Sequence, residues 1–428
     1  MCIRDRSRDI VSHETGHAIV DSIAPDLLDA ATPQSLAIHE TIADLTAMLM
    51  AVNSHNLRKY ILAEGRGSIK PEKGHNPFAE IAEEFGGALG HSHGLRTLLN
   101  DKNLNLQDKE NYVGNSGPHD LSLALSGALF DLLYEIHESL KQEYVSKGKY
   151  AGSKNPYFTV SGYALHKASR RFKRMVFRAL DYLPPGEVSF IDYGRALIAV
   201  DRIAFPADSR MRDWLCKNFL DRFIIRDKSI LEEDDDLVYT RLEEMDMDSF
   251  RKSDWKAYDF ANRNRRFLGI PSEAVFEVRP RLVAEKKYDW DQTGKECIFK
   301  VAWEEIEKNP LGERYPQERK ITVGTTLVID WKTRRILTRL TNAPPRRDAE
   351  GYSCHEEEKR LNEYRDQRKS RDLFLKDLVH KGILLLGRLG LDPEGKPLQS
   401  VVAADVAGGV MSLKRTANML YLTEEDYG

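Results

Sequence analysis

Two histidines and a glutamate near the start of the chain have the types and spacing of a metal-dependent hydrolytic site. His13 and His17 are four residues apart, and Glu14 directly follows the first of them. On a helix such histidines project from one face, so both imidazoles can bind one tetrahedral zinc ion. Glu14 would then lie beside the open coordination position, where a carboxylate can accept a proton from metal-bound water and pass it to a leaving amine. The pattern indicates amide hydrolysis, and two surface histidines on an amphipathic helix are the alternative.

A second segment places carboxylates inside an apolar helix. Glu40 and Asp44 are four residues apart and interrupt an apolar run from Leu36 to Met48. Buried acids need partners, and a metal ion with its histidines would supply them. One carboxylate can complete the zinc coordination while the other holds a ligand histidine from behind. The alternative is an ordinary pair of acids on a helix surface.

A third segment, from Asn115 to Gly127, is a turn rich in glycine and proline that leads into a very apolar helix. It delivers His119 to the start of that helix. A histidine at this place can donate a hydrogen bond to the oxyanion of a tetrahedral intermediate. A capping or core histidine is the alternative.

The elements that must position these residues are mostly helical as far as residue 225. Apolar spacing of three and four predicts helices at Leu36–Val52, Leu121–Leu140, Ala164–Leu183 and Phe190–Phe205, with a break at Pro184-Pro185-Gly186. Residues 227–270 are charge-rich and predict a linker or a solvated helix.

The pattern changes after residue 275. Alternating β-branched and aromatic residues predict strands within Val275–Tyr288, Lys295–Ile306 and Arg319–Leu340, with a hairpin turn at Trp331-Lys332-Thr333-Arg334. A charged helix is expected at about Glu356–Leu386. This α+β module contains no catalytic constellation, and we expect the zinc site to survive its removal.

Composition limits the classes of partner. The 428 residues are 41% hydrophobic, enough for globular cores. A formal net charge of −3 lacks the basic excess that a nucleic-acid-binding surface requires, so no nucleic-acid partner is expected. The four cysteines form no C-x-x-C pair and indicate neither a disulfide framework nor a cysteine metal site. No apolar run approaches the ~20 residues of a membrane span, and no signal-peptide apolar region is visible.

Taken together, the three segments resemble the thermolysin family of zinc metallopeptidases, the gluzincins. In that family an Asp-x-Val-x-His-Glu-x-x-His helix is followed by Glu-x-x-x-Asp on the next helix and later by a Gly-x-x-His turn. The corresponding segments are Asp9–His17, Glu40–Asp44 and Asn115–Gly127. The resemblance covers about residues 9–225, and residues 164–214 resemble the family's carboxy-terminal helical domain.

The resemblance implies a role for each matching residue. His13, His17 and Glu40 map to the zinc ligands, Glu14 to the general base and His119 to the stabiliser of the transition state. Asp44 maps to the partner of His13 in the second shell of the zinc site. Arg96 and Asn115 map to the side of the site that binds the substrate. The implied activity is zinc-dependent endoproteolysis of a peptide or protein substrate, and by resemblance the protein would be secreted.

The expected fold is mainly α: a thermolysin-like helical bundle with an appended C-terminal α+β module. We divide it into a catalytic zinc-binding part at 1–150, a C-terminal helical part at 151–228, a charged linker at 229–274 and a module of unknown role at 275–428. Helical periodicity begins at about Asp9, so the family's amino-terminal β domain is expected to be missing through truncation upstream.

The chain departs from the family's pattern at several positions. No tyrosine lies between His17 and Glu40, where the family uses one for the oxyanion. His39 stands where the family usually has asparagine, so a nearby alternative ligand stays open. Bound calcium is doubtful, because the acidic residues that form the family's calcium sites after the residue matching Glu40 are not evident in this chain. Two alternatives to a peptidase stay open: a non-catalytic binding protein that retains the fold, and a zinc hydrolase acting on a non-peptide amide.

Overall fold

The computed structural model describes most of the chain outside several loops and the last residues. The described residues are 8–30, 32–70, 80–81, 96–114, 117–148, 156–231, 242, 245–288, 293–308, 318–344, 354–380, 384–386, 402–407 and 410–415.

The chain forms two compact units, and each is assembled from more than one segment. The helical unit comprises Met1–Ile23, Ala37–Leu180 and Leu197–Leu231. The sheet unit comprises Ala24–Leu36, Asp181–Ala196 and Glu232–Gly428. The sequence predicted consecutive divisions, whereas two short segments from the first half of the chain cluster with the residues after 232.

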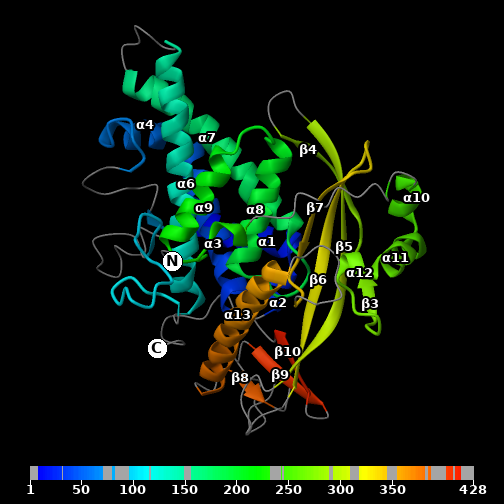
Figure 1. The fold of residues 1–428 in the computed structure, drawn as a ribbon. Helices are drawn as coiled ribbons and strands as arrows, with labels where there is room; N and C mark the ends of the chain where they lie inside the picture. Colours follow the sequence, from blue (N-terminus) through cyan, green and yellow to red (C-terminus); the bar gives the residue numbers. More distant parts are fainter. Residues whose placement is uncertain are drawn as a thin grey trace. The chain divides into compact units, whose positions relative to one another are not determined.

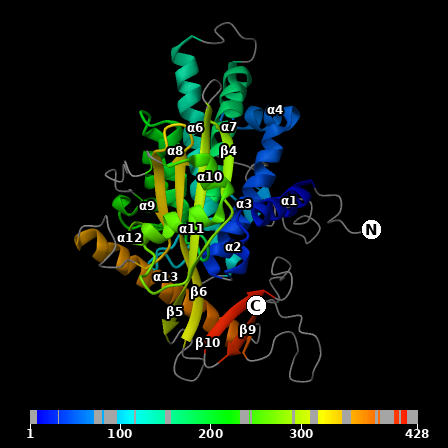
Figure 2. The ribbon, with the colours of Figure 1, turned by 90° about the vertical axis from the view of Figure 1, so that its right-hand side faces the viewer.

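The helical unit is built around long helices whose apolar residues recur every three or four positions (Figure 1). Along α6, Leu121, Leu125, Leu129 and Leu132 are buried at this spacing, and α6 and α7 run side by side in both views (Figures 1 and 2). The elements with residues in this unit are α1 (Arg8–Ile23), α3 (Pro33–Asn53), α4 (His55–Glu64), β1 (Glu80–Ile81), β2 (Arg96–Thr97), α6 (Pro118–Ser146), α7 (Pro156–Tyr182), α8 (Phe190–Ala204), α9 (Arg210–Asp221) and the short 3₁₀ helix η2 (Lys228–Ile230). The helices predicted in this part of the chain are confirmed.

The sheet unit contains one eight-stranded sheet in the order β3-β5-β6-β10-β9-β8, with β4 also pairing with β5 and β7 with β6. Its strands are β3 (Phe276–Val278), β4 (Leu282–Lys287), β5 (Thr293–Lys308), β6 (Glu318–Asp330), β7 (Ile336–Thr341), β8 (Leu384–Leu386), β9 (Val402–Ala407) and β10 (Val410–Arg415). Most pairs are antiparallel, but β10 pairs with β6 and β8 with β9 in parallel. The unit also holds α2 (Asp26–Asp29) and α13 (Cys354–His380).

The predicted hairpin turn is confirmed between β6 and β7. The amide of Arg334 donates to the carbonyl of Asp330, 2.8 Å away, and Arg334 adopts a positive φ of 61°. With these strands and α13, the C-terminal part has the α+β character that was predicted. The helix expected at about 356–386 ends earlier, at His380, and Leu384–Leu386 form β8.

Of the two alternatives predicted for the charged segment, a linker or a solvated helix, the described C-terminal half of 229–274 is helical, with part of its surface buried. This half forms three short helices, α10 (Met247–Lys252), α11 (Asp254–Arg263) and α12 (Arg265–Leu268). Phe250, Ala257 and Phe267 are buried in a core cluster with Phe299 of β5 and Leu327 of β6, and Figure 2 shows α10 and α11 over these strands. These helices form despite the many charged residues, because a few apolar side chains at helical spacing pack against one face of the sheet.

The expectation that no apolar segment could span a membrane needs correction. By length and composition α3 could do so, since it has 21 residues and a mean hydropathy of 1.3 over its most apolar window. In the structure 89% of that window is buried, and the helix carries His39, Glu40 and Asp44. A buried core helix passes the same test, so α3 is weak evidence of a membrane span.

Candidate metal centre

A close crossing of two helices brings the predicted ligands together. At Gly16 of α1, the Cβ atom of any other residue would lie 2.7 Å from the Cα atom of Ala43 in α3, well inside van der Waals contact. Only glycine allows the backbones to approach this closely. The crossing lies between the positions of His13 and His17 on one helix and Glu40 and Asp44 on the other, so all four side chains meet.

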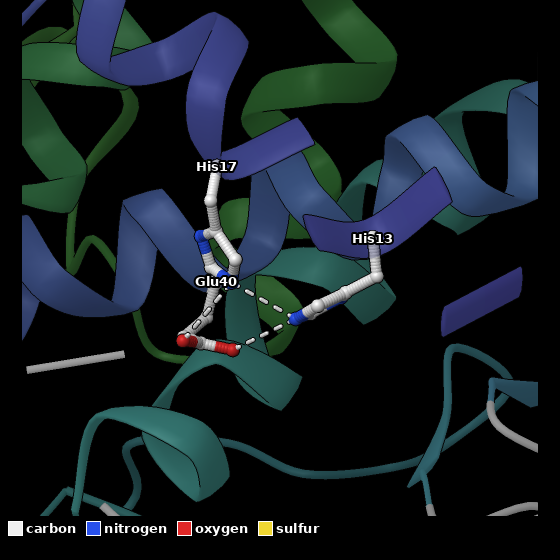
Figure 3. A group of neighbouring side chains, drawn as sticks. All are labelled: His13, His17 and Glu40. Carbon is white, nitrogen blue, oxygen red and sulfur yellow. Dashed lines mark hydrogen bonds and ion pairs between the residues drawn. The ribbon is translucent and has the colours of Figure 1, made fainter. Parts of the chain in front are cut away.

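The three predicted ligands converge on one point (Figure 3). The Nε2 atoms of His13 and His17 are 3.0 Å apart, and each lies 3.6 Å from a carboxylate oxygen of Glu40. Ligand atoms about 2.0–2.2 Å from a tetrahedral ion lie roughly 3.3–3.6 Å from one another. The observed spacings are close to this range, so two imidazoles and a carboxylate could hold one ion, and all three side chains are buried.

Both histidines are held from behind through their Nδ1 atoms. The Nδ1 atom of His13 lies 2.8 Å from Asp44 Oδ1, whose side chain is fully buried. The Nδ1 atom of His17 lies 2.7 Å from Nδ1 of His39, a fully buried imidazole. Behind this ring, His39 Nε2 is 3.9 Å from Asp21. For His13, an Nδ1–H that donates to Asp44 leaves the Nε2 lone pair for a metal, and the same holds for His17 when its Nδ1–H donates to His39.

The electrostatics of the site also favour ligation. Burial lowers the pKa of His17 from 6.5 to about 3, against the opposing pull of Glu40. The imidazole is therefore neutral at physiological pH, and neutral imidazole is the form that binds metal.

Of the other two predicted catalytic residues, Glu14 neighbours a ligand position in the sequence and His119 contacts the cluster itself. Glu14 is half-buried and lies on α1 directly after His13. His119 lies in the first turn of α6, and its Nδ1 atom is 2.9 Å from Glu40 Oε2. Its side chain is 33% exposed, so the imidazole borders solvent as well as the ligand cluster.

Two predicted residues cannot be placed at the centre. The backbone of Arg96 belongs to β2, and its side chain lies outside the part of the chain that the structure describes. Asn115 also lies outside the described residues. Their roles in substrate binding stay predictions.

The sequence did not predict two structural roles: the contact of His39 with His17 and the close helix crossing at Gly16. The sequence indicated His39 as a replacement for the family's asparagine and left it open as an alternative ligand, whereas in the structure its ring contacts Nδ1 of His17. A signal was available, since His39 directly precedes Glu40 in a run that was expected to be buried. Gly16 gave no such signal, because a glycine between two histidines indicates close packing only once the partner helix is known.

Comparisons with known proteins found no relative: no family model, no curated protein and no solved structure matches the chain.

Proposed function

We propose that this chain is a zinc-dependent metalloendopeptidase of thermolysin-like fold, with His13, His17 and Glu40 as the zinc ligands. The observation that carries the proposal is the convergence of their three donor atoms, all within 4.8 Å of one another, in a buried site. Two imidazoles and one carboxylate form a donor set typical of catalytic zinc in peptidases. When bound, zinc would supply a Lewis acid that polarises the scissile carbonyl and lowers the pKa of water.

The remaining chemistry belongs to the chain's own residues. Glu14 accepts the proton of the attacking water and passes it to the leaving amine, as a general base and then a general acid. His119 stabilises the negative charge that develops on the carbonyl oxygen. Its Nδ1 contacts Glu40, which places the imidazole beside a proposed ligand. Asp44 and His39 keep the two ligand imidazoles in place.

Replacing Glu14 with glutamine tests the proposal. This change keeps the shape of the side chain but removes the proton acceptor, while all three ligands remain. We expect one zinc per chain in both proteins by metal analysis after dialysis. Cleavage of a denatured protein substrate should fall by roughly a hundredfold or more in the variant.

A double variant, His13→Ala with His17→Ala, controls for adventitious metal and should lose the zinc. Equal cleavage by wild type and Glu14→Gln would exclude Glu14 as the base. A wild type that holds zinc and cleaves neither proteins nor small amides would favour the non-catalytic alternative.

A further inference from the structure

A second candidate site lies in a cavity of about 390 Å³ in the helical unit, between α4 and α7. Its walls include His55 and Arg58 from α4 and Phe158, Thr159, Tyr163 and His166 from α7. None of the residues assigned to the metal centre lines it. Its volume falls in the range of about 300–1,000 Å³ that small-molecule sites occupy.

The polar groups of this cavity are hydrogen-bond donors. Arg58 Nη1 lies 3.3 Å from His166 Nδ1, and a guanidinium can only donate. The Nδ1 atom of His166 is therefore the acceptor, and its proton resides on Nε2, which becomes a second donor. The donors of Arg58 and His166 suit a ligand that brings acceptors.

The charges around the cavity have one sign. Burial lowers the pKa of His166, and the positive charges of Arg58, Arg170, Lys167 and Lys173 lower it further. No acidic side chain is among the described residues that line the cavity. Its walls also include the first turns of two helices, since α4 begins at His55 and α7 at Pro156. Helix N-termini carry partial positive charge and attract anions.

The rest of the wall is aromatic. Phe158 meets the ring of His55 edge-on, with centroids 5.6 Å apart. Tyr163 is 38% exposed, although it packs against Tyr144 at 5.2 Å. Rings in these positions suit a flat apolar group next to the charged part of a ligand.

We propose that this cavity binds an organic phosphate with an aromatic group, such as a nucleoside monophosphate. The phosphate lies against Arg58, His166 and His55, and the aromatic group lies against Phe158 and Tyr163. The site is separate from the metal centre and does not depend on the proposed peptidase activity.

Calorimetric titration of the full chain with AMP, adenosine and inorganic phosphate tests this proposal. AMP should bind at least tenfold more tightly than adenosine. Arg58→Gln should weaken AMP binding by roughly tenfold to a hundredfold, the usual effect of losing a hydrogen bond to a charged group. Lys59→Gln is the matched control, because it removes the same charge from the same helix at an exposed residue that does not line the cavity.

Tyr163→Ala separates the two halves of the site, since it should weaken AMP binding while leaving phosphate binding unchanged. The proposal fails if AMP shows no binding at millimolar concentration, or if Arg58→Gln and Lys59→Gln weaken it equally. Binding of AMP at the metal centre would likewise be insensitive to Arg58, and that result would also overturn the assignment. Unfolding curves of each variant confirm that lost binding does not reflect lost folding.

Discussion

At the scale of single residues, the two histidines proposed as ligands have different hydrogen-bonding partners. His13 contacts the carboxylate of Asp44, whereas His17 contacts a second imidazole, that of His39. A carboxylate partner makes an imidazole a stronger donor to metal than an imidazole partner does. The centre therefore has one strongly supported and one weakly supported histidine.

Replacing His39 tests the weaker support. His39→Ala should lower zinc affinity by about tenfold to a hundredfold, as is usual when such a partner is lost. His39→Asn retains a polar group near Nδ1 of His17 and should recover part of the affinity. Competition with a chromogenic chelator measures both. Unchanged affinity in a folded His39→Ala chain would mean that packing alone orients His17.

The ligand set could be predicted from the sequence because it depends on local spacing. His13 and His17 share a helix face by periodicity alone, and the same holds for Glu40 and Asp44. The contact of His119 with Glu40 joins residues far apart in the sequence. Only the turn before His119 indicated that this histidine could lie near the site. The contact between His39 and His17 depends on how two helices cross, which no local pattern specifies.

At the scale of elements, the crossing of α1 and α3 controls whether the ligands meet. Gly16→Val would place side-chain atoms against the backbone of Ala43, so the helices must separate. We expect a loss of about 1–3 kcal/mol or more in the free energy of unfolding, the usual range for overpacking, together with weakened zinc binding.

Ala18→Val is the control for Gly16→Val, since Ala18 is exposed on the same helix. It should cost no more than about 0.7 kcal/mol, the scale of helix propensity. Urea unfolding and metal analysis measure both variants. Equal effects of the two substitutions would argue against a close crossing.

A buried histidine linking α6 and α7 should make the helical unit sensitive to acid. His137 Nε2 lies 2.9 Å from Ser161 Oγ, and burial lowers the pKa of His137 from 6.5 to about 4. The unfolded chain takes up this proton at higher pH than the folded chain. Stability should therefore fall as pH drops from about 6.5 to about 4, by up to about 3 kcal/mol, and no further below that.

Comparison with His137→Gln isolates this contribution, because glutamine can still bond Ser161 but does not titrate. Urea unfolding at pH 7 and pH 4.5, with a chelator present throughout, should show a smaller acid loss in the variant. An identical loss in both chains would assign the acid sensitivity to other groups.

Element predictions succeeded where periodicity was strong and failed where pairing partners are distant. The repeated leucines of α6 predicted its helix. The helices α10–α12 were predicted as a linker or a solvated helix because charged residues outnumber Phe250, Ala257 and Phe267, and their burial depends on the sheet that follows. The parallel pairing of β10 with β6 is a long-range contact, which single-strand patterns cannot specify.

At the scale of the whole molecule, the sheet unit is not a simple appendage. Residues 24–36 and 181–196 belong to it, and contacts within the unit tie them in. The side chain of Thr326 in β6 donates to the carbonyl of Leu183, 2.9 Å away. Ser35 Oγ donates to the carbonyl of Val188 at 2.9 Å. The contact of Thr326 with Leu183 argues against the expectation that everything after residue 275 is dispensable.

Truncation after Leu231 should therefore harm the remaining chain. Leu183, Val188 and Phe190, each no more than 3% exposed, would lose the rest of their unit. Each buried side chain of this size contributes about 1.5–3 kcal/mol. We expect aggregation or dye binding by the truncated chain in light scattering and fluorescence.

Truncation after His380 provides the comparison. It removes β8–β10, whose described pairing with β6 involves only two residue pairs, and it should leave a soluble chain. If the shorter chain, ending at Leu231, stays monomeric and holds zinc, the sheet unit is dispensable after all.

The interleaving of the two units has a consequence during synthesis on the ribosome. His13, His17 and Glu40 emerge close together, and the segment between their helices, Ala24–Leu36, emerges with them. That segment belongs with strands that emerge some three hundred residues later, a delay of roughly 15–60 s at about 5–20 residues per second. During this interval the second unit cannot form. Holdase chaperones are therefore expected to bind the nascent chain until β5 and β6 have left the exit tunnel.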